Sequence, residues 1–245
     1  MNRDTVIAVL AALKREISPF LGLMDKVTRK RQSGCTVWEG LFYGVKVRVI
    51  TTGMAAEPPI DLLHGCRALL STGFCGALSG NVHTGDMVVS SSVAYADRDL
   101  IHRILNPEST TGSYDGSGIF DIHVDDVLLT AVQGNFGNER SAIHTGRTVT
   151  CARVIRNSEE KNRIGSYFDA LAVDMEDYGR LIIARQLQTP MWCFRAILDD
   201  VEDTIPGPWS GMGPRKLSKL LGKIPPAQQS ICCMLSAIIP ALGIK

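Results

Sequence analysis

Short, uninterrupted apolar runs alternate with segments whose apolar residues are spaced as in helices. The run Thr5–Ala11 (TVIAVLA) is rich in β-branched residues and continuously apolar, which is typical of a strand buried on both faces. From Leu13 to Leu23 the spacing becomes helical, and Pro19 is expected to shorten or break that helix. The alternation continues along the chain. We therefore predict an α/β fold around a twisted, mostly parallel but mixed sheet, in one domain over residues 1–245.

The remaining predicted elements follow the same two patterns. The pair Tyr43-Gly44 lies between two strand-like segments and indicates a hairpin. A glycine-rich loop is expected over residues 73–85, and a surface loop over residues 106–118. Further strands are predicted at 68–72, 86–90, 142–150, 171–173 and 191–197. Further helices are predicted at 57–64, 124–132, 158–168, 178–187 and about 226–242.

Charge and cysteine usage exclude several classes of protein. The 26 Lys and Arg residues balance 25 Asp and Glu residues, so the chain offers no basic field for a nucleic-acid backbone. No apolar run approaches the ~20 residues of a membrane-spanning helix, and we find no signal peptide. The seven cysteines are scattered without a metal-ligand spacing. We expect no metal site and a reducing, cytoplasmic compartment.

Four segments at predicted strand ends carry acidic or glycine-rich motifs. They are AALKRE, which contains Glu16, then TGFCGAL (72–78), VDMED (173–177) and RAILDD (195–200). Ligands of open α/β sheets bind beyond the carboxyl ends of strands, so these segments are candidates for one site. The glycines of the second segment allow close approach of a ligand to the backbone.

Each acidic motif also has a purely structural interpretation. Glu16 suits the first turn of a helix, where the dipole favours a carboxylate. Asp174 and Asp177 suit a capping pair at a helix N-terminus, although this leaves Glu176 unexplained. Arg195 within an apolar strand needs a buried carboxylate partner, and Asp200 suits the cap of a turn.

Together and in order, the four segments resemble motifs of the nucleoside phosphorylase/nucleosidase superfamily. The closest likeness is to the methylthioadenosine/adenosylhomocysteine nucleosidase-like branch, which carries a GAMEEE-type turn, a TGSAGG loop followed by VGD, VEME and RAISD. The likeness spans Val6 to about Asp203. It implies a three-layer α/β/α fold and cleavage of the N-glycosidic bond of a purine nucleoside. The stretch Glu159-Glu160-Lys161 before VDMED is also similar to the hopanoid-associated phosphorylases of bacteria.

The resemblance implies a role for each matching residue. Asp199 matches the acid that protonates the purine N7, with Asp200 as its rival one residue along. Glu16 matches the carboxylate that activates water, and Glu176 the glutamate that holds the ribose hydroxyls. Such chemistry needs a carboxylic acid of raised pKa and a carboxylate near an oxocarbenium-like sugar. The predicted substrate-binding residues are Met175, Arg195, Gly73, Phe74, Cys75, Gly76, Met54 and Val154.

Some positions depart from the family pattern. Phe74 and Leu198 replace serines, and Val154 replaces the aromatic residue that stacks on the purine. Ser71 stands where hexameric phosphorylases carry a phosphate-binding arginine, which favours water as the nucleophile. Phosphorolysis to ribose 1-phosphate is the alternative, with inorganic phosphate as cosubstrate and no other cofactor. A binding protein without activity is the second alternative. Cations available to a phosphate are Lys14, Arg15 and Arg153.

The C-terminal segment 227–242 has apolar residues at helical spacing. The simpler interpretation is a terminal helix packed on the sheet. The alternative is a peripheral membrane surface formed with the loop Pro206–Pro214 and Lys216, Lys219 and Lys223. A homo-oligomer, preferably a dimer, is expected from the family, although the segment 57–65 is shorter than the family helix that supports the dimer contact.

Overall fold

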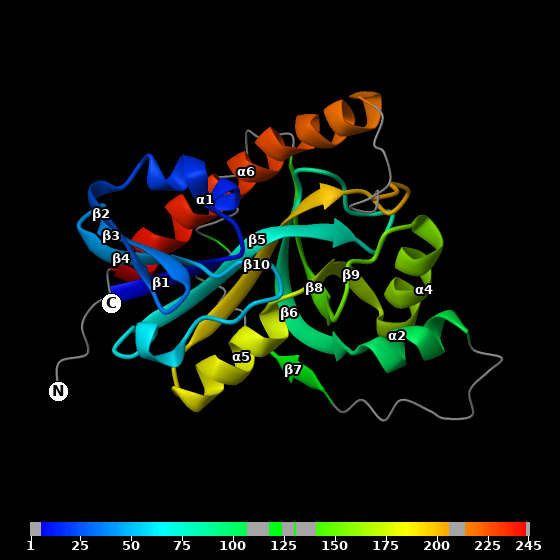
Figure 1. The fold of residues 1–245 in the computed structure, drawn as a ribbon, viewed down its shortest axis with the longest axis horizontal. Helices are drawn as coiled ribbons and strands as arrows, with labels where there is room; N and C mark the ends of the chain where they lie inside the picture. Colours follow the sequence, from blue (N-terminus) through cyan, green and yellow to red (C-terminus); the bar gives the residue numbers. More distant parts are fainter. Residues whose placement is uncertain (1–5, 107–117, 124–129, 131–140, 206–213, 244–245) are drawn as a thin grey trace.

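The computed structural model of the chain describes residues 6–106, 118–123, 130, 141–205 and 214–243. A mixed sheet forms the centre of the molecule, and helices cover it on both sides (Figure 1). In the part of the chain so described, no helix is long and apolar enough to cross a membrane. The three-layer α/β arrangement expected from the sequence is confirmed.

The elements alternate along the chain as the apolar pattern predicts. The strands are β1 (Val6–Ala11), β2 (Asp25–Gln32), β3 (Cys35–Phe42), β4 (Val45–Thr51), β5 (Ala68–Ala77), β6 (Met87–Ala96), β7 (Ile119–Asp121), β8 (Ile143–Cys151), β9 (Ala170–Asp174) and β10 (Met191–Asp199). The helices are α1 (Lys14–Leu21), α2 (Arg98–Leu105), α4 (Ser158–Phe168), α5 (Asp177–Gln186) and α6 (Pro214–Gly243), with one 3₁₀ turn at Ile60–Leu62.

The sheet closes on itself at one end. Its strand order is β10-β6-β8-β9-β5-β1-β4-β3-β2, and β10 also pairs with β5, so five strands form a small barrel. Five of the pairings between described strands are parallel and five are antiparallel. The sheet is therefore mixed, as predicted, but not mostly parallel. The antiparallel share comes from the meander β2-β3-β4 and from the strands that close the barrel.

Helix α6 covers one face of the sheet and α5 the other (Figure 1). The apolar residues of α6 belong to the same core as β1, β4 and β10, so the structural interpretation of the C-terminal helix is confirmed. The helix begins at Pro214, earlier than the predicted start near 226. Its buried apolar side is not a free membrane-facing surface. The residues packed into the core include Ile231, Met234, Leu235, Ile238 and Ile239.

Several local predictions need correction. The glycine-rich segment after residue 72 is not a loop at first, because β5 continues to Ala77. The helix predicted over 57–64 is only the 3₁₀ turn, since two prolines precede it. Strand β2 was not predicted because its sequence, DKVTRKRQ, is polar and exposed almost throughout, as suits an edge strand. The helix predicted over 124–132, apart from residue 130, most of the loop 106–118 and residues 206–213 lie outside the described residues.

Candidate active site

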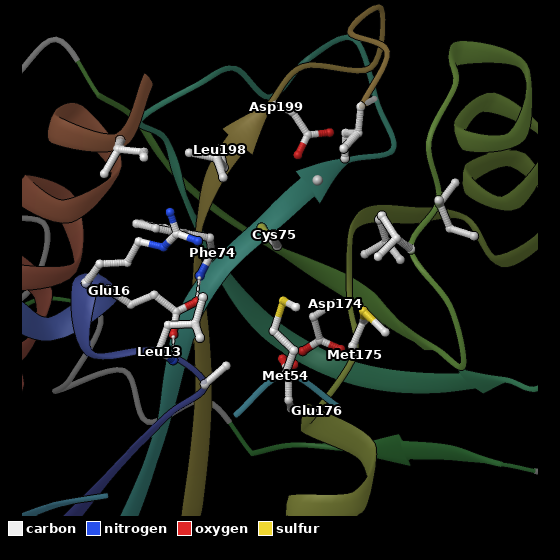
Figure 2. A pocket seen from close by; sticks show the side chains of 18 of the residues that line it. Leu13, Glu16, Met54, Phe74, Cys75, Asp174, Met175, Glu176, Leu198 and Asp199 are labelled. Atoms are coloured by element: carbon white, nitrogen blue, oxygen red, sulfur yellow. Dashed lines mark hydrogen bonds between the residues drawn. The ribbon is translucent and has the colours of Figure 1, made fainter. Parts of the chain in front are cut away.

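A cavity of about 300 Å³ lies where β1, β5, β8, β9 and β10 end or pass close to their ends. Figure 2 shows its acidic groups on different walls, with Asp199 at one end of the view and Glu176 and Met54 at the other. Residues from α6 close the remaining side. The lining residues are Ala12, Leu13, Arg15, Glu16, Met54, Phe74, Cys75, Gly76, Arg153, Val154, Ile155, Val173, Asp174, Met175, Glu176, Leu198, Asp199, Ile205, Leu221 and Ile224.

Glu16 is buried at the first turn of α1, and its carboxylate is held at both oxygens. Oε2 accepts a hydrogen bond of 2.7 Å from the Leu13 N–H, and Oε1 accepts one of 3.0 Å from the Phe74 N–H (Figure 2). The first bond is the reciprocal half of a capping box. Burial raises the pKa of Glu16, although these two hydrogen bonds and the charge of Arg195 act in the opposite direction. The group can therefore exchange a proton nearer neutral pH than an exposed glutamate.

Gly73 allows Glu16 and Arg195 to approach the same stretch of backbone. Its φ of +148° lies in the region that favours glycine. A Cβ atom here would lie 2.8 Å from Nη1 of Arg195 and 2.9 Å from Oε1 of Glu16. Gly73 does not line the cavity itself. It acts from behind the wall, by leaving room for the two charged groups.

Arg195 is fully buried in β10 and is bound by three carboxylates that follow or end β9. Its guanidinium lies 3.0 Å from Asp174, 3.3 Å from Glu176 and 2.5 Å from Asp177. The buried arginine predicted to need a carboxylate partner has three, and Asp199 is not one of them. Arg195 lies behind the cavity wall, where it fixes the acids that face the cavity.

Within this cluster the pKa values of Asp174 and Asp177 shift in opposite directions. Burial alone would raise the pKa of Asp177, but the Arg195 guanidinium outweighs it and lowers the pKa below its ordinary value. Burial raises the pKa of Asp174 well above the usual range, and the Asp177 charge adds to the rise. Burial would lower the pKa of Arg195, yet its carboxylate partners hold it well above the ordinary value. The guanidinium is therefore a permanent charge.

A second fully buried arginine, Arg180, was missed by the sequence analysis. Its Nη1 donates to the Ser71 hydroxyl at 2.8 Å and to the Leu10 carbonyl at 3.2 Å. The Ser71 hydroxyl also donates to Asp177 at 2.5 Å. Ser71, which stands where the resemblance gives hexameric phosphorylases a phosphate-binding arginine, is therefore buried and bound within the protein. The signal for Arg180 was its place on the buried side of α5, between Asp177 and Leu181.

Glu176 connects the cluster to the cavity. Its Oε2 faces Arg195, and its Oε1 accepts a 3.0 Å hydrogen bond from the Ala55 N–H. Met54 and Met175 lie beside it in Figure 2. A carboxylate with fixed donors behind it and a cavity in front is placed to accept hydrogen bonds from ligand hydroxyls.

Asp199 is the last residue of β10, and only 5% of it is exposed. Burial raises the pKa of Asp199, and the ammonium of Lys161, 2.5 Å from Oδ2, offsets part of the rise. Asp200 does not line the cavity. It is half-buried and bound to Lys223 at 2.6 Å and to the Thr84 N–H at 2.7 Å, as the cap of a turn. Of the two rivals, Asp199 is the one on the cavity wall.

The rest of the wall is largely apolar. Val154 and Ile155 follow β8, and Phe74 contributes an aromatic ring. Arg153 also lines the cavity but is bound to Glu160 at 2.8 Å. In the described part of the chain, no group of three or more His, Cys, Asp or Glu side chains is arranged so that it could hold a metal ion. Apolar residues that the sequence analysis did not single out are Leu13, Ile155, Ile205, Leu221 and Ile224.

The structure brings together all the residues predicted for the site. Two of them, Gly73 and Arg195, lie directly behind the wall and contact wall residues. The predicted residues on the wall itself are Glu16, Met54, Phe74, Cys75, Gly76, Val154, Met175, Glu176 and Asp199.

Comparisons with known proteins agree on the family. The model described as "Phosphorylase superfamily" matches residues 6–215. A 5'-methylthioadenosine/S-adenosylhomocysteine nucleosidase of Maridesulfovibrio salexigens is 26% identical over 209 residues, covering 80% of this chain and 87% of the relative.

Two solved structures illustrate the shared fold. The Neisseria meningitidis 5'-methylthioadenosine/S-adenosylhomocysteine nucleosidase, in complex with methylthio-immucillin-A, has a TM-score of 0.75 at 20% identity, with 97% of this chain and 99% of that chain covered. The futalosine hydrolase of Helicobacter pylori has a TM-score of 0.74 at 16% identity, with 98% and 100% covered.

Proposed function

The chain belongs to the phosphorylase superfamily, and from this premise we propose that it hydrolyses the N-glycosidic bond of an adenosine-type nucleoside. The observation that carries the proposal is one apolar-walled cavity in which three of the lining carboxyl groups, Glu16, Glu176 and Asp199, are held by different partners. The activity named for the Maridesulfovibrio salexigens relative supports the substrate class. The cavity volume of about 300 Å³ suits a nucleoside-sized ligand.

Asp199 is the general acid of the proposed reaction. A purine leaves far more readily once N7 accepts a proton, so the acid must hold its proton near neutral pH. Burial of Asp199, which raises its pKa, supports this role.

Glu16 activates the attacking water. Its carboxylate is buried, and its two oxygens have fixed donors, so one orientation is maintained while a water proton is accepted. Its raised pKa makes it a better base than an exposed glutamate. Gly73 leaves room for both Glu16 and Arg195 beside the same stretch of backbone, and the charge of Arg195 opposes the rise in the pKa of Glu16.

Glu176 binds the ribose hydroxyls, and Met175 packs against the sugar. Positive charge develops on the sugar as the bond breaks, and nearby carboxylates stabilise an oxocarbenium-like transition state. The carboxylates of Glu176 and Asp177 beside Arg195 support this assignment.

Water is favoured over phosphate by the state of the cations. Ser71 is buried and bound to Asp177 and Arg180, and Arg153 is bound to Glu160. Arg15 lines the cavity and is exposed. A phosphorylase needs several cations converging on one anion. Ser71 is not a cation and Arg153 is paired with Glu160, so these positions support hydrolysis instead.

The 5' substituent meets an apolar part of the wall. Leu13 and Leu198 lie on the sheet side and Leu221 and Ile224 on α6. We propose a 5'-substituted adenosine with an uncharged, apolar group, in line with the methylthio compounds in the names of the relatives.

A homodimer in the cytoplasm completes the proposal. Met54 lines the cavity yet is 65% exposed, so the wall beside Glu176 is open in a single chain. A second copy over this wall would exclude water. Light scattering after size-exclusion chromatography measures the mass directly.

The test is release of free base from a panel of nucleosides. The purified chain is incubated with 5'-methylthioadenosine, S-adenosylhomocysteine, adenosine and inosine, with and without phosphate, and the bases are separated by chromatography. Hydrolysis in H₂¹⁸O is expected to put the label on C1 of the sugar, and phosphate is expected to have no effect. Phosphate-dependent formation of a sugar 1-phosphate would establish phosphorolysis. Binding without base release from any of the panel would favour the non-catalytic alternative.

A further inference from the structure

Lys161 is a fully buried lysine beside the cavity, although it does not line it. It comes from the inner side of α4, in line with Ile164 and Phe168. Its ammonium lies 2.5 Å from Oδ2 of Asp199 and also contacts the backbone carbonyls of Asp200 at 2.6 Å and Asp203 at 3.1 Å. The three N–H donors of the ammonium therefore have three acceptors.

Burying the Lys161 ammonium is unfavourable in free energy, which argues against a Lys161–Asp199 pair that has no role. An isolated ammonium in a protein interior is strongly unfavourable unless it is paired and fully hydrogen-bonded. An apolar residue at the same position of α4 would pack beside Ile164 without that cost. The lysine therefore needs an explanation beyond the packing of α4.

The Asp199 carboxylate is confined from a second side by β5. A Cβ atom at Gly76 would lie 3.0 Å from Oδ2 and 3.4 Å from Oδ1 of Asp199. The backbone of β5 thus approaches the carboxylate closely, while Lys161 binds one of its two oxygens. With Oδ2 engaged, Oδ1 is the oxygen that remains for a ligand in the cavity.

We propose that Lys161 is a positioning residue for the general acid: it binds Oδ2 of Asp199 and so presents Oδ1 to the departing base. This inference rests on the proposed function, because it assumes that Asp199 protonates the base. It adds that the acid works as a Lys161–Asp199 pair supplied by two different elements, α4 and β10.

Lys223 provides an internal comparison. It comes from α6 and binds the carboxylates of Asp200 and Asp203 in the same turn. It therefore also fastens the turn, but it makes no hydrogen bond to Asp199. A residue that only fastens the turn should behave like Lys223. A residue that positions the acid should not.

The two lysines predict different pH profiles. Activity needs protonated Asp199, so kcat/KM falls as the pH rises through the pKa of this group. Burial raises that pKa, and Lys161 offsets part of the rise. Removing the lysine charge raises the pKa further, and the falling limb moves to higher pH. The other charged or titratable groups around Asp199 are Asp203 and Asp200 in the turn, Lys223 on α6 and Cys75 on β5. Arg153, paired with Glu160, lines the same cavity.

The experiment compares Lys161→Gln with Lys223→Gln in the full chain. Glutamine at 161 retains two N–H donors for the turn carbonyls but carries no charge. The pH profile of kcat/KM for adenine release is recorded for both variants and for the unaltered chain. For Lys161→Gln we expect the falling limb to move up by about 1–3 pH units and kcat to fall at least ~10-fold at its own optimum. For Lys223→Gln we expect a shift below ~0.5 unit.

Lys161→Arg separates position from charge and covers a Gln variant that does not fold. Its charge leaves the limb in place, but a guanidinium binds both carboxylate oxygens and withdraws Oδ1 from the base. We expect kcat to fall with the limb unmoved. Circular dichroism and thermal unfolding establish that each variant is folded. Folded variants whose profile and kcat match those of Lys223→Gln would overturn the inference. Failure of the unaltered chain to release any base would overturn the proposed function instead.

Discussion

The two ends of the cavity hold their carboxyl groups in opposite ways. At one end, which we call the arginine cluster, Arg180 and Arg195 lie among Asp174, Glu176 and Asp177, and Glu16 adds a fourth acid. At the lysine end, Asp199 has one buried cation, Lys161. Acids outnumber cations at the first end and are matched at the second.

This difference suits a reaction in which charge separates along the cavity. A carboxylate close to the sugar, such as Glu176, stabilises the positive charge that develops on it. A single acid beside a single cation suits a proton donor, because its pKa responds to both burial and the ion pair. Three variants and one set of substrate analogues test this contrast.

The largest effect is expected for Asp199→Asn at the lysine end. The amide is the same size but has no acidic proton, so the leaving base must depart unprotonated. We expect kcat to fall by about 10²–10⁴-fold with the fold intact, as measured by initial rates and circular dichroism. Asp200→Asn is the matched control, because Asp200 does not line the cavity, and its effect should stay within a few-fold. Near-native turnover by Asp199→Asn would remove Asp199 from the mechanism.

Arg195→Met tests the arginine cluster through stability. The change leaves three carboxylates buried without their shared cation, and loss of one partner of a buried pair costs about 3–5 kcal/mol. Urea denaturation should record a loss of this size in the free energy of unfolding. Arg153→Met, which removes the partly exposed pair with Glu160, should cost at most about 1 kcal/mol. Equal losses in the two variants would contradict the contrast between the sites.

The arginine cluster is also tested from the substrate side. If Glu176 accepts hydrogen bonds from the ribose hydroxyls, a 2'-deoxy or 3'-deoxy substrate leaves a buried charged acceptor without one of them. The loss is about 1.5–3 kcal/mol, or roughly 10- to 150-fold in kcat/KM. A 5'-deoxy nucleoside is the control, since its change lies away from Glu176. Ribo and deoxyribo substrates cleaved with equal efficiency would disprove the assignment.

The sequence predicted the arginine cluster better than the lysine end. Asp174, Glu176 and Asp177 stand together in one motif, and Arg195 begins another, so local crowding of charge indicated a site. Lys161 lies 38 residues from Asp199, and only the fold brings the two together. The signal available was a lysine on the same helical face as Ile164 and Phe168, which local motif analysis passed over.

The same difference between local patterns and contacts of distant segments explains the errors in the predicted fold. Apolar runs predicted the buried strands β1 and β10 because burial on both faces selects such residues. Strand β2 is a polar edge strand that pairs only with β3 in the described sheet. Its sequence therefore carries no apolar pattern that would predict it. Closure of the barrel depends on β10 pairing with both β5 and β6, which no local pattern records. Residues of α6 reach the cavity for the same reason, through packing between distant segments.

The smallest expected effect concerns the apolar wall between the two ends. Val154 lies on this wall, at a position where the resemblance implies an aromatic residue stacked on the base. Val154→Tyr would supply such a ring, and an aromatic contact contributes about 0.5–1.5 kcal/mol beyond the area it buries. Because stacking binds substrate and transition state alike, we expect KM to fall by roughly 2- to 10-fold with kcat unchanged. Val154→Ile enlarges the apolar surface without a π face and should leave KM almost unaltered. If both variants lower KM equally, the wall acts through apolar contact alone. If Tyr raises KM, the base lies elsewhere in the cavity, and the two ends must be assigned anew.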